Sequence, residues 1–379
     1  MPSSGPRTHT FTVRRVAVVG TGLMGGSLGL AIRRARPDID VTGFDQPSVL
    51  AEALQRGAIT RSASSIGECV RGADVVIFAA PIAATLRLLE EAAPHLDGVA
   101  VVTDLCSVKT PVLERAADVL PDGVLFVGGH PMTGSERTGI RHARELLYEN
   151  ATYVLCPPDP VPPEHAAALE GFENLLRAIG ARLLRLDARA HDESVAHVSH
   201  LPQLLAVLLV NQAGGESERL DAVFELAAGG FRDMTRIAGS SFSIWRDIVA
   251  GNRGPILDAL GAYAARLQAV RNRLAEDDWE AVGALFADAE EIRQRIPAAE
   301  TGALRTIVDI FVFVPDETGA LHRIISLLAT SGLDIRDIEL LKLREGTGGT
   351  FRLGFDTPRN ADRAVDVLTS DGIQAYRLN

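Results

Sequence analysis

Apolar and polar positions divide the 379-residue chain into three stretches of different periodicity. From Arg14 to about Asp187, short apolar runs alternate with amphipathic segments of helical period, as at Ala83–Ala93 and Lys109–Val119. This alternation predicts a mostly parallel sheet whose strands are joined by crossover helices. The predicted strands are Val16–Val19, Val41–Phe44, Val75–Ala79, Val99–Thr103, Leu125–Val127 and Tyr153–Leu155.

The strand pattern stops near Ala188, and only helical periodicity follows as far as Ile296. The predicted helices are His191–Gly214, Pro255–Ala275 and Asp278–Arg295. The first of them is apolar around most of its circumference, which is more apolar surface than one face of a small domain covers. We therefore expect this helical region to form the core of a homodimer.

The pattern changes again in the last stretch of the chain, which has the order βαββαβ of a ferredoxin-like module. Its predicted strands are Ile307–Val314, Ile335–Leu343, Thr350–Phe355 and Ile373–Leu378, and its predicted helices are Ala320–Thr330 and Ala361–Ser370. The predicted organisation is a disordered tail (1–13), a Rossmann-type domain (14–187), a helical dimerisation and substrate domain (188–297), a linker (298–303) and the βαββαβ domain (304–379).

The first predicted strand, Val16–Val19, leads into glycines spaced G-x-G-x-x-G. Gly20 permits a tight turn, Gly22 lets a pyrophosphate approach the backbone, and Gly25 lets the following helix pack on the strand. The second strand ends in Asp45, where an acidic residue binds the ribose hydroxyls of NAD. A purely structural glycine-rich turn is the alternative, but the context favours a dinucleotide site with NAD as the cofactor.

Composition excludes several classes of function. A formal net charge of −11 argues against broad affinity for nucleic acids. Three widely spaced cysteines suggest neither a metal site nor a disulfide framework. The polar N-terminus and the lack of a long uninterrupted apolar run indicate a cytoplasmic protein without a membrane partner. Because Lys109 and Lys342 are the only lysines, Lys109 is the one serious candidate for a catalytic lysine.

Two loops after predicted strands carry candidate chemistry. In the loop Thr103–Lys109, Ser107 is by itself typical of a helix N-cap. In the loop Gly128–Glu136, His130 lies between glycines and Pro131, and an imidazole so placed can act as a base near neutral pH. Carboxyl ends of parallel strands are where such sheets hold their ligands, which favours a catalytic role for the histidine.

The helical region carries a third group of candidates, in the segments Ser199–Gln203, Gly229–Arg236 and Trp245–Asp247. Arg232 and Arg236 are four residues apart and are predicted to share one helix face. Two neighbouring cations in an acidic protein suggest an anion site, and the planar guanidinium suits a carboxylate. A solvated, salt-bridged face is the alternative.

Together these segments resemble the prephenate/arogenate dehydrogenases of tyrosine biosynthesis, over nearly the whole chain. The family's G-x-G-x-M-G-G-S, T-D-x-x-S-V-K, H-P-x-x-G-[ST]-E, S-H-x-P and G-G-F-x-D-x-T-R-[IV]-A motifs, with W-R-D after the last, are all present in order. The resemblance implies NAD-dependent oxidative decarboxylation of prephenate to 4-hydroxyphenylpyruvate. The C-terminal module resembles an ACT regulatory domain through Asp316–Leu321 and Gly332–Ile335.

The resemblance also implies residue roles. His130 is the catalytic base, Ser107 orients it and the nicotinamide, and Arg236 holds a substrate carboxylate. A gating network around the pocket is formed by Glu136, Asp233 and Trp245. The other substrate-binding residues are Ser135, His200, Gln203 and Gly229. The cofactor-binding residues are Gly20, Gly22, Leu23, Met24, Gly25, Asp45, Ala80, Pro81 and Ser107.

Several alternatives stay open from the sequence. Gln203 stands where many family members have a second histidine, so the substrate is prephenate, arogenate or 4-amino-4-deoxyprephenate. A β-hydroxyacid dehydrogenase needs a lysine on the interdomain helix, and residues 188–297 contain none. A non-enzymatic sensor of NAD and amino acids would not need His130, Ser107 and Arg236 together. An ACT domain implies an aromatic amino-acid effector, expected to be tyrosine at Asp316–Gly319, whereas a ferredoxin-like fold without a ligand is the alternative.

Overall fold

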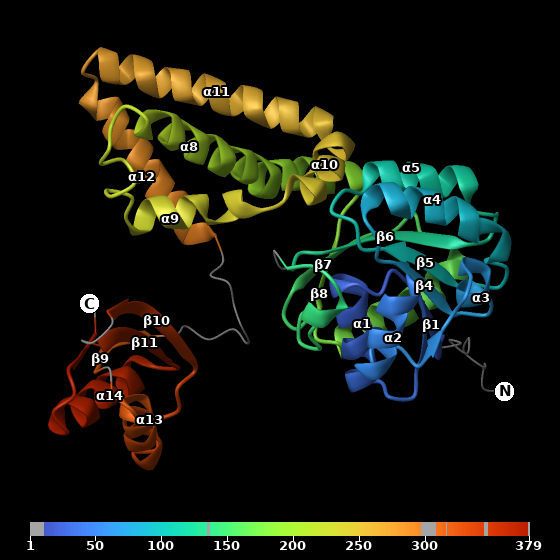
Figure 1. Ribbon diagram of the computed structural model, residues 1–379, viewed down its shortest axis with the longest axis horizontal. Coiled ribbons are helices and arrows are strands. Elements are labelled where there is room, and N and C mark those ends of the chain that lie inside the picture. The colour runs from blue at the N-terminus through green and yellow to red at the C-terminus, as the bar shows by residue number, and fades with distance from the viewer. Residues whose placement is uncertain (1–10, 135–136, 297–307, 316, 345–347, 378–379) are drawn as a thin grey trace, which may run out of the picture. The chain divides into compact units, whose positions relative to one another are not determined.

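The computed structural model describes residues 11–134, 137–296, 308–315, 317–344 and 348–377 (Figure 1). It divides into two units, and the boundary between Ile296 and Pro297 adjoins the predicted linker. The predicted linker itself (298–303) and residues 1–10 of the predicted tail lie outside the described residues.

The first unit contains an eight-stranded sheet in the order β3-β2-β1-β4-β5-β6-β7-β8. Its strands are β1 (Arg15–Val19), β2 (Asp40–Phe44), β3 (Arg61–Ser62), β4 (Val75–Phe78), β5 (Val101–Asp104), β6 (Leu125–Pro131), β7 (Thr152–Cys156) and β8 (Arg182–Arg185). All neighbouring strands pair in parallel except β6 and β7, which are antiparallel. The order 3-2-1-4-5-6 is that of a doubly wound Rossmann sheet, so the predicted parallel sheet is confirmed.

Helices cover both faces of this sheet (Figure 1). They are α1 (Leu23–Ala35), α2 (Pro47–Gln55), α3 (Ile66–Val70), α4 (Ile82–Ala92), α5 (Thr110–Val119) and α6 (Ala166–Ala178). In β1, Val16 and Val18 join the core beneath α1, α2 and α6, whereas Ala17 and Val19 join the core beneath α3, α4 and α5. Burial on both faces explains why the central strands read as continuous apolar runs.

Residues 188–296 are helical, as predicted. The elements are α7 (Ala188–Val195), a π-helical turn η4 (Ala196–His200), α8 (Leu201–Ser217), α9 (Gly229–Thr235), a 3-10 turn η5 (Arg236–Gly239), α10 (Phe242–Gly251), α11 (Arg253–Ala275) and α12 (Trp279–Arg295). Their own core contains only four buried side chains, while large apolar side chains such as Leu267 (61% exposed) and Phe286 (76% exposed) face outward. The single chain thus leaves this domain's apolar surface largely uncovered.

The continuous helical run Ala188–Ser217 is long and apolar enough to cross a membrane, since it contains an 18-residue window with a mean hydropathy of 1.3. The core helix of a soluble protein meets the same two criteria, so length and composition do not distinguish the two cases. Within this run, His191, Asp192 and His200 are buried and hydrogen-bonded to other parts of the protein. The contacts of His191 and Asp192 tie the helix to the nucleotide-binding domain, whereas that of His200 stays within the helical domain.

The second unit has the predicted element order: β9 (Val308–Val314), α13 (Ala320–Thr330), β10 (Asp337–Arg344), β11 (Gly348–Phe355), α14 (Pro358–Ser370) and β12 (Ala375–Tyr376). The strands form an antiparallel sheet in the order β10-β11-β9-β12. The last strand begins at Ala375 and not at the predicted Ile373 because the Ile373 N–H bonds the Leu368 carbonyl in the turn after α14, and the predicted end of the strand, Leu378, lies outside the described residues. Ile307, the predicted start of the first strand, and Asp316 lie outside the described residues.

Candidate active site

The predicted site residues of the first domain follow the carboxyl ends of neighbouring parallel strands. The glycine loop follows β1, Ala80 and Pro81 follow β4, Ser107 follows β5, and His130 lies near the end of β6. In an open α/β sheet, ligands bind outside these strand ends, where the strand order reverses. Here the reversal falls between β1 and β4, so the fold directs all four segments toward one edge.

The glycine loop forms a cradle that larger side chains would fill. Gly20 has a φ of +98°, and a Cβ there would lie 2.8 Å from the Ala79 carbonyl oxygen. A Cβ on Gly25 would lie 1.9 Å from the Gly20 carbonyl oxygen, whereas space is open at Gly22. No side chain caps the start of α1 at Leu23, so the first N–H groups of the helix suit a pyrophosphate.

Asp45 stands at the end of β2 with its carboxylate held by backbone donors. One oxygen accepts the Thr21 N–H at 2.7 Å, and the other accepts the Gln46 N–H at 2.7 Å. A carboxylate has about four acceptor positions, so both oxygens can still accept ribose hydroxyls. The loop and this carboxylate together fit a dinucleotide.

Lys109 is not available as a free catalytic lysine. Its ammonium contacts the Asp104 carboxylate, and both side chains are fully buried. The same ammonium donates to the Gly129 carbonyl at 2.6 Å, while Asp104 accepts the Gly129 N–H at 3.1 Å. The ion pair therefore fixes the backbone of the residue that precedes His130.

The interpretation of Ser107 as a helix cap is wrong. The helix α5 begins at Thr110, and no side chain of its own N-terminal segment caps it. Instead, the Asp192 carboxylate on α7 accepts the N–H groups of Lys109 and Thr110, each at 2.8 Å. A carboxylate of the helical domain thus accepts hydrogen bonds from the N–H groups at the start of α5. The catalytic role of Ser107 stays a prediction.

His130 is held by a second histidine that the sequence analysis did not identify. Its Nδ1 lies 2.8 Å from Nε2 of His191, and His191 Nδ1 lies 2.8 Å from an oxygen of Asp192. Burial lowers the pKa of His130 well below 6.5, and the nearby Lys109 charge adds to this effect. The imidazole is therefore neutral near pH 7, which is the form that a general base requires.

His200 is buried next to this arrangement. Asn252 on the loop before α11 donates to the Asp192 carbonyl at 2.7 Å, and its Nδ2 lies 3.0 Å from Nδ1 of His200. The other side of the His200 ring meets Trp245 edge-on, at 5.9 Å between ring centroids. Burial lowers the pKa of His200 to about 4, so this ring is also neutral near pH 7.

The remaining predicted substrate residues lie on or near α9 and η5. α9 ends at Thr235 and Arg236 begins η5, so Arg232 and Arg236 lie in two directly consecutive helical elements, and their shared face stays a prediction. Gln203 on α8 donates to the Ile237 carbonyl at 2.9 Å and so holds the segment that carries Arg236. Gly229 and Asp233 are exposed on α9, and Ser135 and Glu136 lie outside the described residues.

Both domains that contribute to this site match known protein families. Residues 28–185 match the family model for the nucleotide-binding domain of prephenate dehydrogenase, and residues 187–288 match that for its dimerization domain. The two ranges cover more than half of the chain. The chain belongs to the prephenate dehydrogenase family.

Individual members of the prephenate dehydrogenase family align along most of the chain. Prephenate dehydrogenase of Bacillus subtilis is 35% identical over 355 residues, which are 93% of this chain and 95% of that protein. The structure of Aquifex aeolicus prephenate dehydrogenase with hydroxyphenyl propionate and NAD+ superposes with a TM-score of 0.69 at 27% identity, covering 76% of this chain and all of that one. Synechocystis arogenate dehydrogenase has a TM-score of 0.67 at 29% identity, covering 75% of this chain and all of that one.

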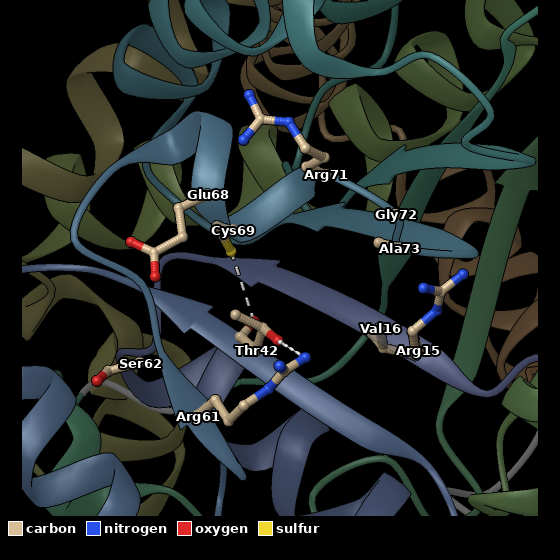
Figure 2. A pocket seen from close by; sticks show the side chains of 10 residues that line it. All are labelled: Arg15, Val16, Thr42, Arg61, Ser62, Glu68, Cys69, Arg71, Gly72 and Ala73. Atoms are coloured by element: carbon tan, nitrogen blue, oxygen red, sulfur yellow. Dashed lines mark hydrogen bonds between the residues drawn. The ribbon is translucent and has the colours of Figure 1, made fainter.

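A separate cavity of about 140 Å³ lies toward the amino ends of β1 and β4 (Figure 2). Its lining includes three arginines, but Arg15 pairs with Asp74 at 3.8 Å and Arg61 lies 3.5 Å from the Thr42 hydroxyl. Burial raises the pKa of Cys69 in its wall to about 12.

The network shows which polar residues the sequence analysis missed: His191, Asp192 and Asn252. One signal was present in the sequence. His191-Asp192 opens an apolar helix, and charged residues that are buried in such a helix are usually paired. The contact between His130 and His191 was not predictable from local sequence, because the two residues are 61 positions apart.

Proposed function

We propose that this chain is an NAD-dependent dehydrogenase that converts prephenate to 4-hydroxyphenylpyruvate with loss of CO2. The observation that carries the proposal is His130, a neutral imidazole beside the carboxyl edge of a dinucleotide-binding sheet. The match to a prephenate dehydrogenase over 93% of this chain supports the choice of substrate.

In this mechanism the chain's own residues bind and orient the substrate and move one proton. His130 accepts the proton of the substrate hydroxyl, and Arg236 holds a substrate carboxylate. The glycine loop with Leu23 and Met24, and Asp45, Ala80, Pro81 and Ser107, would hold NAD+, which when bound takes the hydride from the carbinol carbon. The electrons of the broken carbon–carboxylate bond enter the ring, which becomes aromatic as CO2 leaves. Because aromatisation drives the reaction, positioning and one base suffice.

The direct test is steady-state kinetics on prephenate, arogenate and 4-amino-4-deoxyprephenate, with reduced cofactor and the organic product both measured. We expect the highest kcat/KM with prephenate and 4-hydroxyphenylpyruvate as the product. Turnover of none of the three compounds would contradict the proposal.

Arogenate is the second candidate substrate. Synechocystis arogenate dehydrogenase is nearly as similar in fold as the Aquifex enzyme and slightly higher in identity. In addition, Gln203 cannot carry a charge, and its amide group already donates to the Ile237 carbonyl. A higher kcat/KM for arogenate than for prephenate would assign the chain to this activity.

We predict that NAD is preferred over NADP. The Asp45 carboxylate would repel a 2′-phosphate, and Gln46 beside it supplies no positive charge. Replacing Asp45 by Asn removes the repulsion and weakens the bond to the ribose, so the ratio of kcat/KM for NAD to that for NADP should fall by about tenfold or more. Asp40→Asn, at the exposed start of the same strand, is the control. A wild-type preference for NADP would show that Asp45 does not bind the ribose.

We further propose that the protein is a cytoplasmic homodimer with its helical domain at the interface and without nucleic-acid or membrane partners. Supporting this are the match of residues 187–288 to a dimerization domain and the exposed apolar side chains of α8, α11 and α12. We expect light scattering at micromolar concentration to give the mass of two chains. The mass of a single chain would contradict the dimer.

The C-terminal unit is proposed to be an ACT domain that binds an aromatic amino acid, expected to be tyrosine. A cavity of about 470 Å³ lies at the start of α13, lined among others by Thr318, Gly319 and Arg323. No side chain caps α13, whose N-cap Gly319 has a φ of 90°, so its N–H groups can receive a carboxylate. Asp316, the predicted partner of the ammonium, lies outside the described residues.

Removal of this unit tests its role. A chain ending at Ala299 should keep dehydrogenase activity, as the boundary at Ile296 supports, but lose the part of tyrosine inhibition that arises at the C-terminal site. Inhibition by competition at the active site should remain. Coupling between the two sites is expected to be about 1–3 kcal/mol. An unchanged response to tyrosine, together with no amino-acid binding by calorimetry, would make the unit structural.

A further inference from the structure

Asp192 is a buried carboxylate that accepts three hydrogen bonds. One oxygen accepts the Lys109 N–H and lies 2.8 Å from Nδ1 of His191, and the other accepts the Thr110 N–H. Burial opposes its ionisation, but the hydrogen bonds from His191, Thr110 and Lys109 outweigh it and hold the pKa of Asp192 below its ordinary value. The group is therefore ionised near neutral pH and can only accept hydrogen bonds.

The ionised Asp192 determines the direction of every bond in the chain that ends at His130. Because the carboxylate only accepts, Nδ1 of His191 must carry the proton that lies between them. With the His191 ring in its neutral form, Nδ1–H is its one N–H, so its Nε2 accepts a hydrogen bond. The partner of that nitrogen is Nδ1 of His130, which must then be the donor. The Nε2 atom of His130 is left with its lone pair.

We propose that His191 and Asp192 are positioning residues that fix His130 in the tautomer whose Nε2 can receive the substrate proton. The inference rests on the proposed function, since the role of His130 as a base belongs to it. When Nε2 takes the proton, Nδ1–H stays bonded to His191, and no proton needs to pass to Asp192. Carboxylate partners of catalytic histidines in other enzymes act in the same way, by tautomer and orientation.

The charged and titratable groups around the two rings do not reverse this direction. Lys109 at the start of α5 is paired with Asp104 at the end of β5. His200 in η4 has a pKa lowered to about 4, chiefly by burial, and is neutral. Asp192 is the anion among the described groups that act on His130, and one of its oxygens lies 2.8 Å from Nδ1 of His191.

The hydrogen bonds of His191 and Asp192 also make the tautomer of His130 depend on how the helical domain packs against the nucleotide-binding domain. His130 belongs to β6, whereas His191 and Asp192 belong to α7, and Asp192 caps α5 of the nucleotide-binding domain. The contacts that seat α7 against α5 are thus the ones that set the tautomer. A displaced α7 would leave His130 in place but free to carry its proton on Nε2.

Two substitutions at His191 distinguish loss of the hydrogen-bond acceptor for His130 from a general disturbance of the site. His191→Leu removes the acceptor for Nδ1–H of His130, and kcat should fall on the order of 10²-fold or more. His191→Gln offers a carbonyl oxygen at a similar reach and should keep kcat within about tenfold of wild type. His197→Leu, in the following element η4 and exposed to solvent, is the matched control and should keep wild-type kcat. The affinity for NAD should change in none of them.

The tautomer is read directly by NMR of the protein labelled with 15N in histidine, with the His130→Asn spectrum assigning the signal. We expect His130 to be protonated on Nδ1 and unprotonated on Nε2 in the wild type and in His191→Gln, and to gain protonation on Nε2 in His191→Leu. A proton on Nε2 in the wild type, or an unchanged tautomer and kcat in His191→Leu, would overturn the inference. If His191→Leu does not fold, the wild-type and Gln spectra still decide. Failure of the wild type to turn over any candidate substrate would refute the proposed function instead, and the spectra would still report the tautomer.

Discussion

His130→Asn should lower kcat by about 10²–10⁴-fold and leave the Kd for NAD nearly unchanged, because general-base assistance is typically of that size. Asparagine keeps a polar group near His191 but has no nitrogen that takes up a proton. The loss should therefore appear in turnover and not in cofactor binding, which we propose depends on the glycine loop and Asp45.

The dependence of kcat/KM on pH provides a second test of His130 as the base. Burial and the Lys109 charge lower the pKa of His130, so the active, neutral ring persists to a lower pH than an ordinary histidine would. In the wild type, kcat/KM should be flat through neutral pH and fall only below 6.5, as His130 becomes protonated. The Asn variant should lack that acid limb, and the His197→Asn control should retain it. A variant with near-normal kcat at neutral pH would refute the assignment of His130 as the base.

Much of the fold followed from local pattern because its central strands are buried on both faces. Val16 to Val19 alternate between two cores, so every position is apolar and the strand is visible in the sequence. The two strands that were not predicted, β3 and β8, lack this burial on both faces. In β3 both residues are exposed, and in β8 two arginines flank two leucines at the edge of the sheet.

The candidate site was predictable only where one segment carries the chemistry. The glycine loop and the histidine before Pro131 can each be recognised within one short segment of the sequence. The partners of His130 are not, since His191 reaches it from a different domain. Likewise, sequence spacing made Ser107 the natural cap of α5, yet the cap is Asp192, 82 residues beyond Thr110. Such contacts depend on how the helical domain seats on the sheet, which no local period encodes.

Arg236→Gln should raise the KM for substrate by about 10- to 100-fold, with little change in the KM for NAD. A charge-assisted hydrogen bond to a carboxylate contributes about 1.5–3 kcal/mol, and each 1.4 kcal/mol is tenfold in affinity. Arg236 is exposed and has no ion-pair partner within the described parts of the chain, so its removal breaks no internal salt bridge. Glutamine can still donate hydrogen bonds but lacks the charge and the two-point fork of arginine.

Arg219→Gln is the matched control for this prediction, because Arg219 is an exposed arginine of the same domain that pairs with Glu216 at 2.7 Å. It should leave both KM values unchanged. If Arg232→Gln weakens substrate binding as much as Arg236→Gln does, the two arginines share the carboxylate although they lie in different elements. Equal weakening of substrate and NAD by Arg236→Gln would instead place Arg236 outside the substrate pocket. Because Gln203 holds the backbone of this segment through Ile237, Gln203→Leu should reproduce part of the Arg236 defect by displacing the guanidinium without removing its charge.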